Sequence, residues 1–420
     1  PTPCTARPEP AVDFDDTPEE AAWRQECRAF LDQHAEPKPQ VLDWSESYWA
    51  RPPSAEEEEA ARQAGRRWQL TKFENGWAGL TWPVEFGGRG LSSHFNAIFA
   101  EEEARYDLPH GPFAQSIGMA GPTIIAHGTD EQRARYLTPM LRGDDIWCQL
   151  FSEPGAGSDL AGLRTTGVVD GEEIVVNGQK VWTSNAVEAA HGMLLVRTDP
   201  DVPKHRGITY LLVDMTTPGI DIRPLRQPNG RAEFNEVFLD DVRVPVANVL
   251  GEINGGWGPI LSTLANERQG IGTGSRAGVG DLADLARHFG VADDPMVRQD
   301  LMRLHAVGET MRFLGYRVRT AASQGAMPGP ESSVLKLAAS RRLELQGDLA
   351  MAIMGAAGTL NGPDAHMNGF WQNFAFLSQW MARIGGGTDQ VQRNIVGENV
   401  LGLPQEPRPD KGIPFRDIPT

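Results

Sequence analysis

The hydrophobic pattern of the first part of the chain is that of helices. From about residue 19 to residue 142, apolar residues recur three or four positions apart, as in Cys27, Phe30 and Leu31, which is typical of amphipathic helices. Residues 76–90 interrupt this pattern with glycines and a proline, which predict a loop.

The pattern changes near residue 147 to that of strands. The β-rich runs up to about residue 248 are 165–169, 174–176, 193–197, 208–213 and 236–239. Asp170-Gly171 and Asn177-Gly178 are hairpin-turn dipeptides, because glycine accepts the positive φ that such turns need. No helical pattern separates the runs, so we expect a small antiparallel barrel or sandwich instead of a doubly wound parallel sheet.

Long helical patterns return after residue 255. The expected helices are 259–287, 296–324, 332–354, 363–381 and 388–400, and such lengths pack most easily as a four-helix bundle. We therefore predict an α+β chain of three domains. Their expected ranges are 18–147 (helical), 148–255 (β) and 256–403 (helical bundle), between a flexible arm at 1–17 and a proline-rich arm at 404–420.

Charge and composition narrow the function. The 420 residues include 56 acidic and 39 basic side chains, a formal net charge of −17, and nucleic-acid binding needs concentrated positive charge. The apolar runs fall far short of the roughly 20 residues that span a bilayer, and the acidic start lacks the apolar segment of a secretion signal. Three scattered cysteines and nine scattered histidines favour neither disulfides nor a metal site. We expect a cytoplasmic enzyme that handles a small molecule.

Two segments could carry chemistry. In FSEPGAGSDL (151–160), a Gly-x-Gly core between Ser152 and Ser158 can present N–H groups and hydroxyls to a phosphate or a ring edge. In KVWTSN (180–185), Trp182 can pack flat on a ring while Thr183 or Ser184 reaches the polar edge of that ring. The competing interpretations are a glycine-rich turn between domains and an ordinary core tryptophan. GTGSRA (272–277) follows a helical pattern instead of a strand, so it fails as a dinucleotide-binding motif.

Several motifs together resemble the acyl-CoA dehydrogenase family. They are WPVEFGGRGLS, FSEPGAGSDL, NGQKVWTSN, FNEVFLDDVRVP and GGTDQVQRNIVGENVLG, in the family's order between about residues 19 and 403. The family's architecture of a helical domain, a small β domain and a four-helix bundle agrees with the three regions above.

The resemblance implies an FAD cofactor and an acyl-CoA substrate. In the family, a carboxylate removes the α proton of the thioester while the β hydrogen leaves as a hydride to the flavin. Residues at cofactor-binding positions are, by similarity, Phe151, Ser152, Gly157, Ser158, Trp182, Ser184, Thr388 and Gln390. Ser158 and Arg268 fall at positions near CoA.

The sequence departs from the commonest family pattern at the catalytic base. That base is the glutamate of an EGT triplet, where this chain has Gly386. The family's second solution, a glutamate on the first bundle helix, falls on Glu267. Glu267 can be interpreted as an ordinary exposed helix carboxylate paired with a basic neighbour. Because Gly386 has no side chain that could take a proton, we favour Glu267 as the catalytic base. The Gly386 N–H can still donate to the thioester oxygen.

Assembly and electron transfer follow from the same resemblance. The leading hypothesis is a dehydrogenase that passes electrons to an electron-transfer flavoprotein in lipid metabolism, as a homodimer or homotetramer. The alternatives are a non-catalytic or half-site subunit paired with a related chain, and a flavin oxidase or monooxygenase. The family's Arg-x-x-Phe-Gly segment, which reaches the partner's FAD, is only approximated here by residues 287–290, so that contact is not predicted. A bulky or branched acyl group is slightly favoured.

Overall fold

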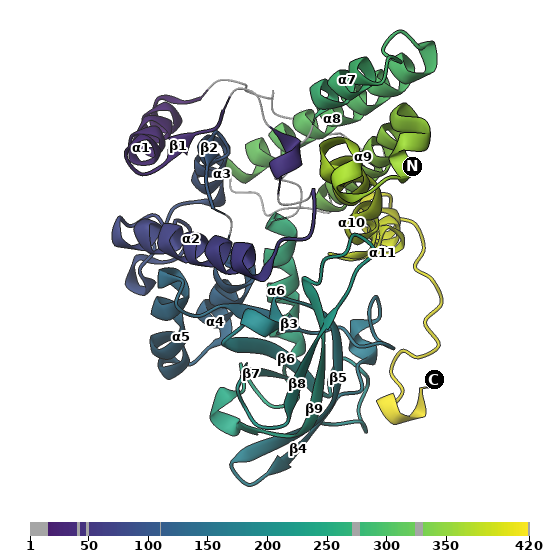
Figure 1. Cartoon of the computed structure of the whole chain (residues 1–420). Coiled ribbons are helices and arrows are strands. Elements are labelled where there is room, and N and C mark those ends of the chain that lie inside the picture. Colours follow the sequence, from purple (N-terminus) through teal and green to yellow (C-terminus); the bar gives the residue numbers. More distant parts are fainter. Residues whose placement is uncertain are drawn as a thin grey trace, which may run out of the picture.

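A computed structural model (Figure 1) describes residues 16–39, 43–47, 50–109, 111–270, 278–323 and 331–418. In the view of Figure 1 the β sheet lies below, the N-terminal helices lie to the left and the C-terminal helices lie to the upper right. The α+β architecture expected from the sequence is confirmed.

The N-terminal part is helical. Its helices are α1 (Pro18–His34), α2 (Ala55–Glu74), α3 (Ser93–Glu103), α4 (Gly121–His127) and α5 (Asp130–Arg142), with two short paired strands, β1 (Glu36–Pro37) and β2 (Tyr106–Asp107). Three helices begin with a capping box, which satisfies two end N–H groups reciprocally: Thr17 with Glu20, Ser54 with Glu57 and Thr129 with Gln132. Residues 76–90 form the predicted loop and contain a single short 3-10 turn, Val84–Phe86.

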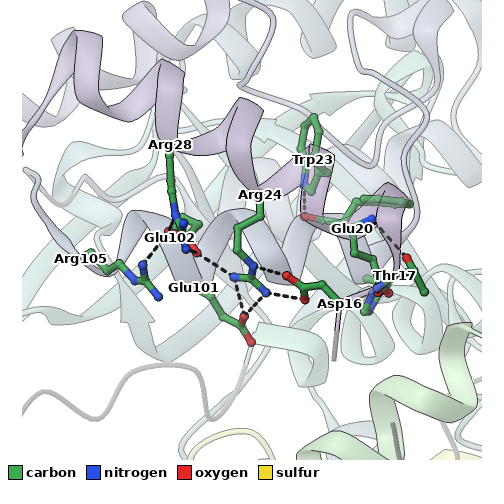
Figure 2. Close-up of polar contacts among 11 residues, drawn as sticks. Asp16, Thr17, Glu20, Trp23, Arg24, Arg28, Glu101, Glu102 and Arg105 are labelled. Atoms are coloured by element: carbon green, nitrogen blue, oxygen red, sulfur yellow. Dashed lines mark hydrogen bonds and ion pairs between the residues drawn. The ribbon is translucent and has the colours of Figure 1, made fainter. Parts of the chain in front are cut away.

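A buried carboxylate ties α1 to α3 (Figure 2). The side chain of Glu102 is fully buried and accepts hydrogen bonds of 2.8 Å from both Arg24 and Arg28, with Arg105 at 3.2 Å. Burial alone would raise the pKa of Glu102, but the bonds from Arg28 and Arg24 outweigh burial and lower it. Glu102 is therefore held as a carboxylate between the two helices.

The middle part is a seven-stranded sheet. The strands are β3 (Trp147–Leu150), β4 (Thr166–Asp170), β5 (Glu173–Ser184), β6 (His191–Arg197), β7 (Ile208–Asp214), β8 (Ile220–Leu225) and β9 (Phe234–Pro245). Their order is β3-β6-β4-β5-β9-β8, with β7 paired to β6. The expected antiparallel pairing holds for β4–β5, β5–β9, β6–β7 and β8–β9, whereas β6 pairs in parallel with β3 and β4.

One of the two predicted hairpin turns is correct. Asp170 and Gly171 (φ +65°) turn the chain between β4 and β5, whereas the turn predicted at Asn177-Gly178 is wrong. That dipeptide lies inside β5, where the pairing with β9 shifts its register. A Cβ on Gly178 would lie 2.8 Å from the Thr165 Cα, so glycine is needed there for close backbone approach.

The C-terminal part contains α6 (Trp257–Gly270), α7 (Val279–His288), α8 (Pro295–Ser323), α9 (Glu331–Met354), α10 (Gln379–Ile384) and α11 (Asp389–Ile395). The helix predicted at 259–287 is described as two helices, and the GTGSRA segment between them lies outside the described residues. The helix predicted at 363–381 is wrong in its first half. Met367, Asn368 and Gly369 have positive φ, which ends a short turn before the π-helix Trp371–Leu377.

One hydrophobic core joins the three parts. It combines Trp82 and Leu137 of the N-terminal part, Phe151 and Tyr210 of the sheet, and Ile260 of α6. The helix that carries Glu267 thus packs against β7 and shares this core with Phe151.

Candidate active site

The glycine-rich segment that follows β3 forms a tight turn with open donors. Glu153 and Ala156 exchange both backbone hydrogen bonds at 3.0 Å, which closes the turn around Pro154 and Gly155. Beyond it, the exposed N–H groups of Gly157 and Ser158 donate to no acceptor within the described residues. A methyl group added at Gly157 would meet nothing within 4 Å, so this face of the segment is open to a ligand.

A buried ion pair fixes the segment to β5. The Lys180 Nζ lies 2.7 Å from the Glu153 Oε1 and donates to the Phe151 carbonyl at 3.2 Å. Glu153 also accepts the N–H groups of Arg164 (2.6 Å) and Thr165 (2.9 Å). Burial lowers the pKa of Lys180 to about 8, although the negative charge of Glu153 acts in the opposite direction and raises it. Burial also acts to raise the pKa of Glu153, but the charge of Lys180 lowers it, so the pair is ionised at neutral pH.

Trp182 presents its ring to the outside. The register of β5 against β9 shifts between Lys180 and Thr183, and Trp182 at this bulge has φ +62° and is 61% exposed. Its indole meets the Phe234 ring edge-on at 6.1 Å. The structure therefore excludes the interpretation of Trp182 as a core residue.

Backbone bonding brings the two predicted cofactor segments together. The N–H of Val181 donates to the carbonyl of Ser152 at 2.9 Å, and half-buried Ser184 pairs with Phe234 of β9. Buried Phe151 lies behind this surface, with its ring 5.8 Å from that of Tyr210. Phe151, Ser152, Trp182 and Ser184 thus belong to one small region of the sheet.

Glu267 lies on the helix that packs behind Phe151. In α6 the hydroxyl of Thr263 is buried and lies 3.2 Å from the Tyr210 hydroxyl and 3.0 Å from that of Thr123. Glu267 follows Thr263 by four residues, so it lies one turn further on the same face of the helix. Its side chain is half-buried, while the side chain of Arg268 lies outside the described part of the chain.

Gly386 lies in a turn between α10 and α11. It has φ +64°, and its carbonyl accepts a hydrogen bond of 3.0 Å from buried Gln392. Thr388 caps α11 by accepting the N–H of Val391, and Gln390 is exposed in the first turn of the helix. A left-handed conformation of this kind favours glycine.

The turn is anchored to the rest of the C-terminal part and to the sheet. Buried Asp389 pairs with buried Lys336 at 2.9 Å. Asn229, in the loop between β8 and β9, donates to Ser378 just before α10 at 3.3 Å. Gly386, Thr388 and Gln390 therefore form a second group of predicted site residues, on a different part of the fold from Trp182.

Sequence reasoning missed the residues that organise this region. Glu153 and Lys180 are not among the predicted site residues, although each is a charged side chain inside an otherwise small or apolar segment. That contrast is the signal that could have found them, since buried charges need a partner. The described residues contain no group of three or more His, Cys, Asp or Glu side chains placed to hold a metal ion. None of the described helices has the length and apolarity to cross a membrane.

Comparison with known proteins identifies the class. Models of the N-terminal, middle and C-terminal domains of acyl-CoA dehydrogenase match residues 17–144, 148–242 and 254–401. The chain therefore belongs to the acyl-CoA dehydrogenase family, a class of flavoprotein oxidoreductases.

Several members of the family are similar to this chain over most of its length. Acyl-CoA dehydrogenase FadE34 of Mycobacterium tuberculosis is 41% identical over 80% of this chain, which spans 46% of that relative's length. Acyl-CoA dehydrogenase IpdE1 of the same organism is 39% identical over 83% of this chain and 90% of its own length. Among solved structures, the Tcur3481-Tcur3483 steroid ACAD superposes with a TM-score of 0.76 at 31% identity, covering 94% of this chain and all of that one. The ChsE4-ChsE5 complex from M. tuberculosis gives a TM-score of 0.73, also at 31% identity, over 94% of this chain and all of that one.

Proposed function

We propose that this chain binds FAD and catalyses α,β-dehydrogenation of an acyl-CoA thioester. The observation that carries the proposal is the open indole of Trp182 on a strand bonded to the glycine-rich segment, whose Gly157 and Ser158 N–H groups have no acceptor among the described residues. A planar ring stacked on Trp182 and a diphosphate held by those N–H groups satisfy both features, and FAD has both parts. When bound, FAD accepts the hydride that leaves the β carbon.

The remaining cofactor residues extend this surface. Phe151 supports it from inside, Ser152 and Ser184 offer hydroxyls at the ring edge, and Thr388 and Gln390 contact the cofactor from the C-terminal part. Ser158 and Arg268 serve the CoA moiety as well.

Glu267 is the proposed base. The α C–H of a thioester is a weak acid, so its removal needs both a positioned carboxylate and donors that stabilise the developing enolate oxygen. Glu267 takes the α proton from the direction of α6, and the N–H of Gly386 donates to the thioester oxygen. Because residue 386 is glycine, no side chain at that position occupies the space next to the α carbon of the substrate.

The substrate is proposed to be a bulky, ring-bearing acyl-CoA. Removing the EGT glutamate side chain leaves room near the α carbon, and one of the most similar solved structures is named a steroid ACAD. Straight-chain acyl-CoA thioesters serve as the comparison class.

Anaerobic flavin bleaching tests the proposal. The purified chain is loaded with FAD and titrated with straight, branched and polycyclic acyl-CoA thioesters. We expect stoichiometric loss of flavin absorbance with the bulky members and slow reoxidation by O₂, with electrons passing to an electron-transfer flavoprotein. A protein that binds no FAD, or whose flavin no thioester bleaches even with a related subunit present, contradicts the proposal. Rapid reoxidation of the reduced flavin by O₂ would instead support the alternative of a flavin oxidase or monooxygenase.

A subunit of a mixed assembly is the second candidate. Gly386 in place of glutamate favours it, and two similar structures carry paired names, one of them a ChsE4-ChsE5 complex. Co-expression with a neighbouring homologue and sizing of the purified product discriminate the two. A chain that bleaches alone as a homo-oligomer supports the first candidate, and FAD binding that appears only with the second polypeptide supports the other.

A further inference from the structure

Residues 410–418 fold back onto the sheet domain. In Figure 1 the yellow segment leaves α11, runs down the right side and ends beside the sheet. The N–H groups of Phe415 and Arg416 donate to the carbonyls of Val202 (2.9 Å) and Pro200 (3.1 Å), and Pro414 forms a β-bridge with Pro203. The arm expected from the sequence is therefore attached to the loop between β6 and β7.

The ring of Phe415 covers a buried arginine. Phe415 is only 7% exposed, and the Arg197 guanidinium carbon lies 3.7 Å from its ring centroid. Arg197 donates to the carbonyls of Ala161 (2.6 Å) and Leu163 (3.3 Å), which directly follow the glycine-rich segment 151–160. Because a buried guanidinium is stabilised by an aromatic face, Phe415 holds Arg197 in place against those carbonyls.

An ion-pair bridge makes a second connection to the same segment. The Nζ of Lys204 lies 2.9 Å from the Asp159 carboxylate and 2.6 Å from that of Asp410. Asp159 follows Ser158 directly, and its carbonyl accepts the N–H of Gly162 in the 3-10 turn Leu160–Gly162. Both connections thus lead from 410–418 to residues 159–163.

We propose that residues 410–418 act as a strap that holds the 157–163 loop in its ligand-binding conformation, with Phe415 and Asp410 as positioning residues. The ligand group is a diphosphate, supplied by FAD or by CoA. The ligand part of this inference rests on the proposed function, whereas the control of the loop does not.

The experiment compares three variants of the full chain. Phe415→Leu keeps an apolar side chain but removes the aromatic face from Arg197, and Asp410→Asn removes the charge that Lys204 bridges. Arg416→Ala is the matched control, since Arg416 pairs only with exposed Asp201 at 2.7 Å within the described residues and lies on the same strap. Should Phe415→Leu fail to fold, Asp410→Asn, an exchange at a surface ion pair, supplies the same comparison.

Hydrogen exchange of the FAD-free protein reads the loop directly. We expect the Gly162 and Leu163 amides to exchange about 10-fold faster in Phe415→Leu and several-fold faster in Asp410→Asn, with no change in Arg416→Ala. Unchanged exchange in both test variants overturns the proposal, whatever FAD does.

Binding then distinguishes the ligand sources. Titration of the apoprotein with FAD and of the FAD-loaded protein with CoA should show dissociation constants raised about 5-fold for at least one of them, while kcat at saturation changes less than about 2-fold. If the amides exchange faster but FAD and CoA bind as tightly as before, the strap still controls the loop. In that case the proposed role of the loop in ligand binding is wrong.

Discussion

Trp182 is held in a backbone conformation that L-residues other than asparagine and aspartate seldom adopt. Its φ of +62° arises at the bulge between Lys180 and Thr183, and its ring is left open to solvent. A role in binding a flat ring explains both the strained backbone of Trp182 and the exposure of its side chain. A glycine-rich segment anchored by a buried ion pair lies next to it.

Replacing Trp182 separates strain from binding. Trp182→Gly should leave the free energy of unfolding of the apoprotein unchanged or raise it by up to about 1 kcal/mol, because glycine adopts this conformation freely. FAD affinity should fall at least 10-fold with loss of the stacking surface. Asn185→Gly, at another positive φ (+59°), is the control and should keep FAD affinity. Urea unfolding and FAD titration measure both quantities, and a Trp182→Gly protein that binds FAD normally contradicts the stacking role.

The Glu153–Lys180 pair gives a second prediction at this scale. Lys180→Met leaves the Glu153 carboxylate buried without its cation, so the free energy of unfolding should fall by about 3 kcal/mol. The double variant Glu153→Gln, Lys180→Met should recover more than half of that loss. A double variant as unstable as Lys180→Met alone would show that packing, and not the uncompensated charge, sets the cost.

At the scale of elements, the apolar packing of α1 against α3 includes one buried carboxylate that links the two helices (Figure 2). Because Arg24 and Arg28 lower the pKa of Glu102 below 4.5, the folded state binds its proton less readily than the unfolded state does. The stabilisation from this group is therefore present above about pH 4.5 and is lost as the pH falls through the lowered pKa.

Glu102→Gln tests that contact. We expect a loss of about 2 kcal/mol in the free energy of unfolding at pH 7, because charge-assisted hydrogen bonds to a buried group are removed. The gap between the variant and the wild type should shrink toward pH 3. Glu101→Gln, at an exposed neighbour that also touches Arg24, should change stability by less than about 0.5 kcal/mol. Urea melts of the three proteins at both pH values measure this, and a gap that does not depend on pH contradicts the role of the charge.

Elements governed by local patterns were predictable, and elements governed by distant contacts were not. Helices such as α8 and α9 follow from their spacing of apolar residues. Asn177-Gly178 has the composition of a turn, but pairing with β9 extends β5 straight through it. The candidate segments around Ser158 and Trp182 could be predicted, whereas the exposure of Trp182 comes from a bulge that only the register of two strands defines. Glu153 and Lys180 were missed because their pairing joins residues far apart in the sequence.

At the scale of the whole molecule, three parts share one core, and α6 joins that core from the C-terminal side. The strap formed by residues 410–418 then returns to the sheet. The glycine-rich segment and the residues after it are therefore contacted both by the sheet and by the C-terminal part of the chain. The formal charge of −17 does not oppose the proposed binding of anionic FAD and CoA at this segment, where Arg164, Arg197 and Lys204 lie. We interpret the acidic surplus as a property of other surfaces.

The most direct test of the account is anaerobic single turnover of Glu267→Gln. The variant should bind FAD as the wild type does, because the cofactor residues are unchanged, while the rate of flavin bleaching by an acyl-CoA that bleaches the wild type falls about 1000-fold, as expected for loss of a general base. Glu309→Gln, at a half-buried glutamate on α8, is the matched control and should bleach normally. A Glu267→Gln protein that still bleaches at the wild-type rate would contradict the central claim that Glu267 removes the α proton.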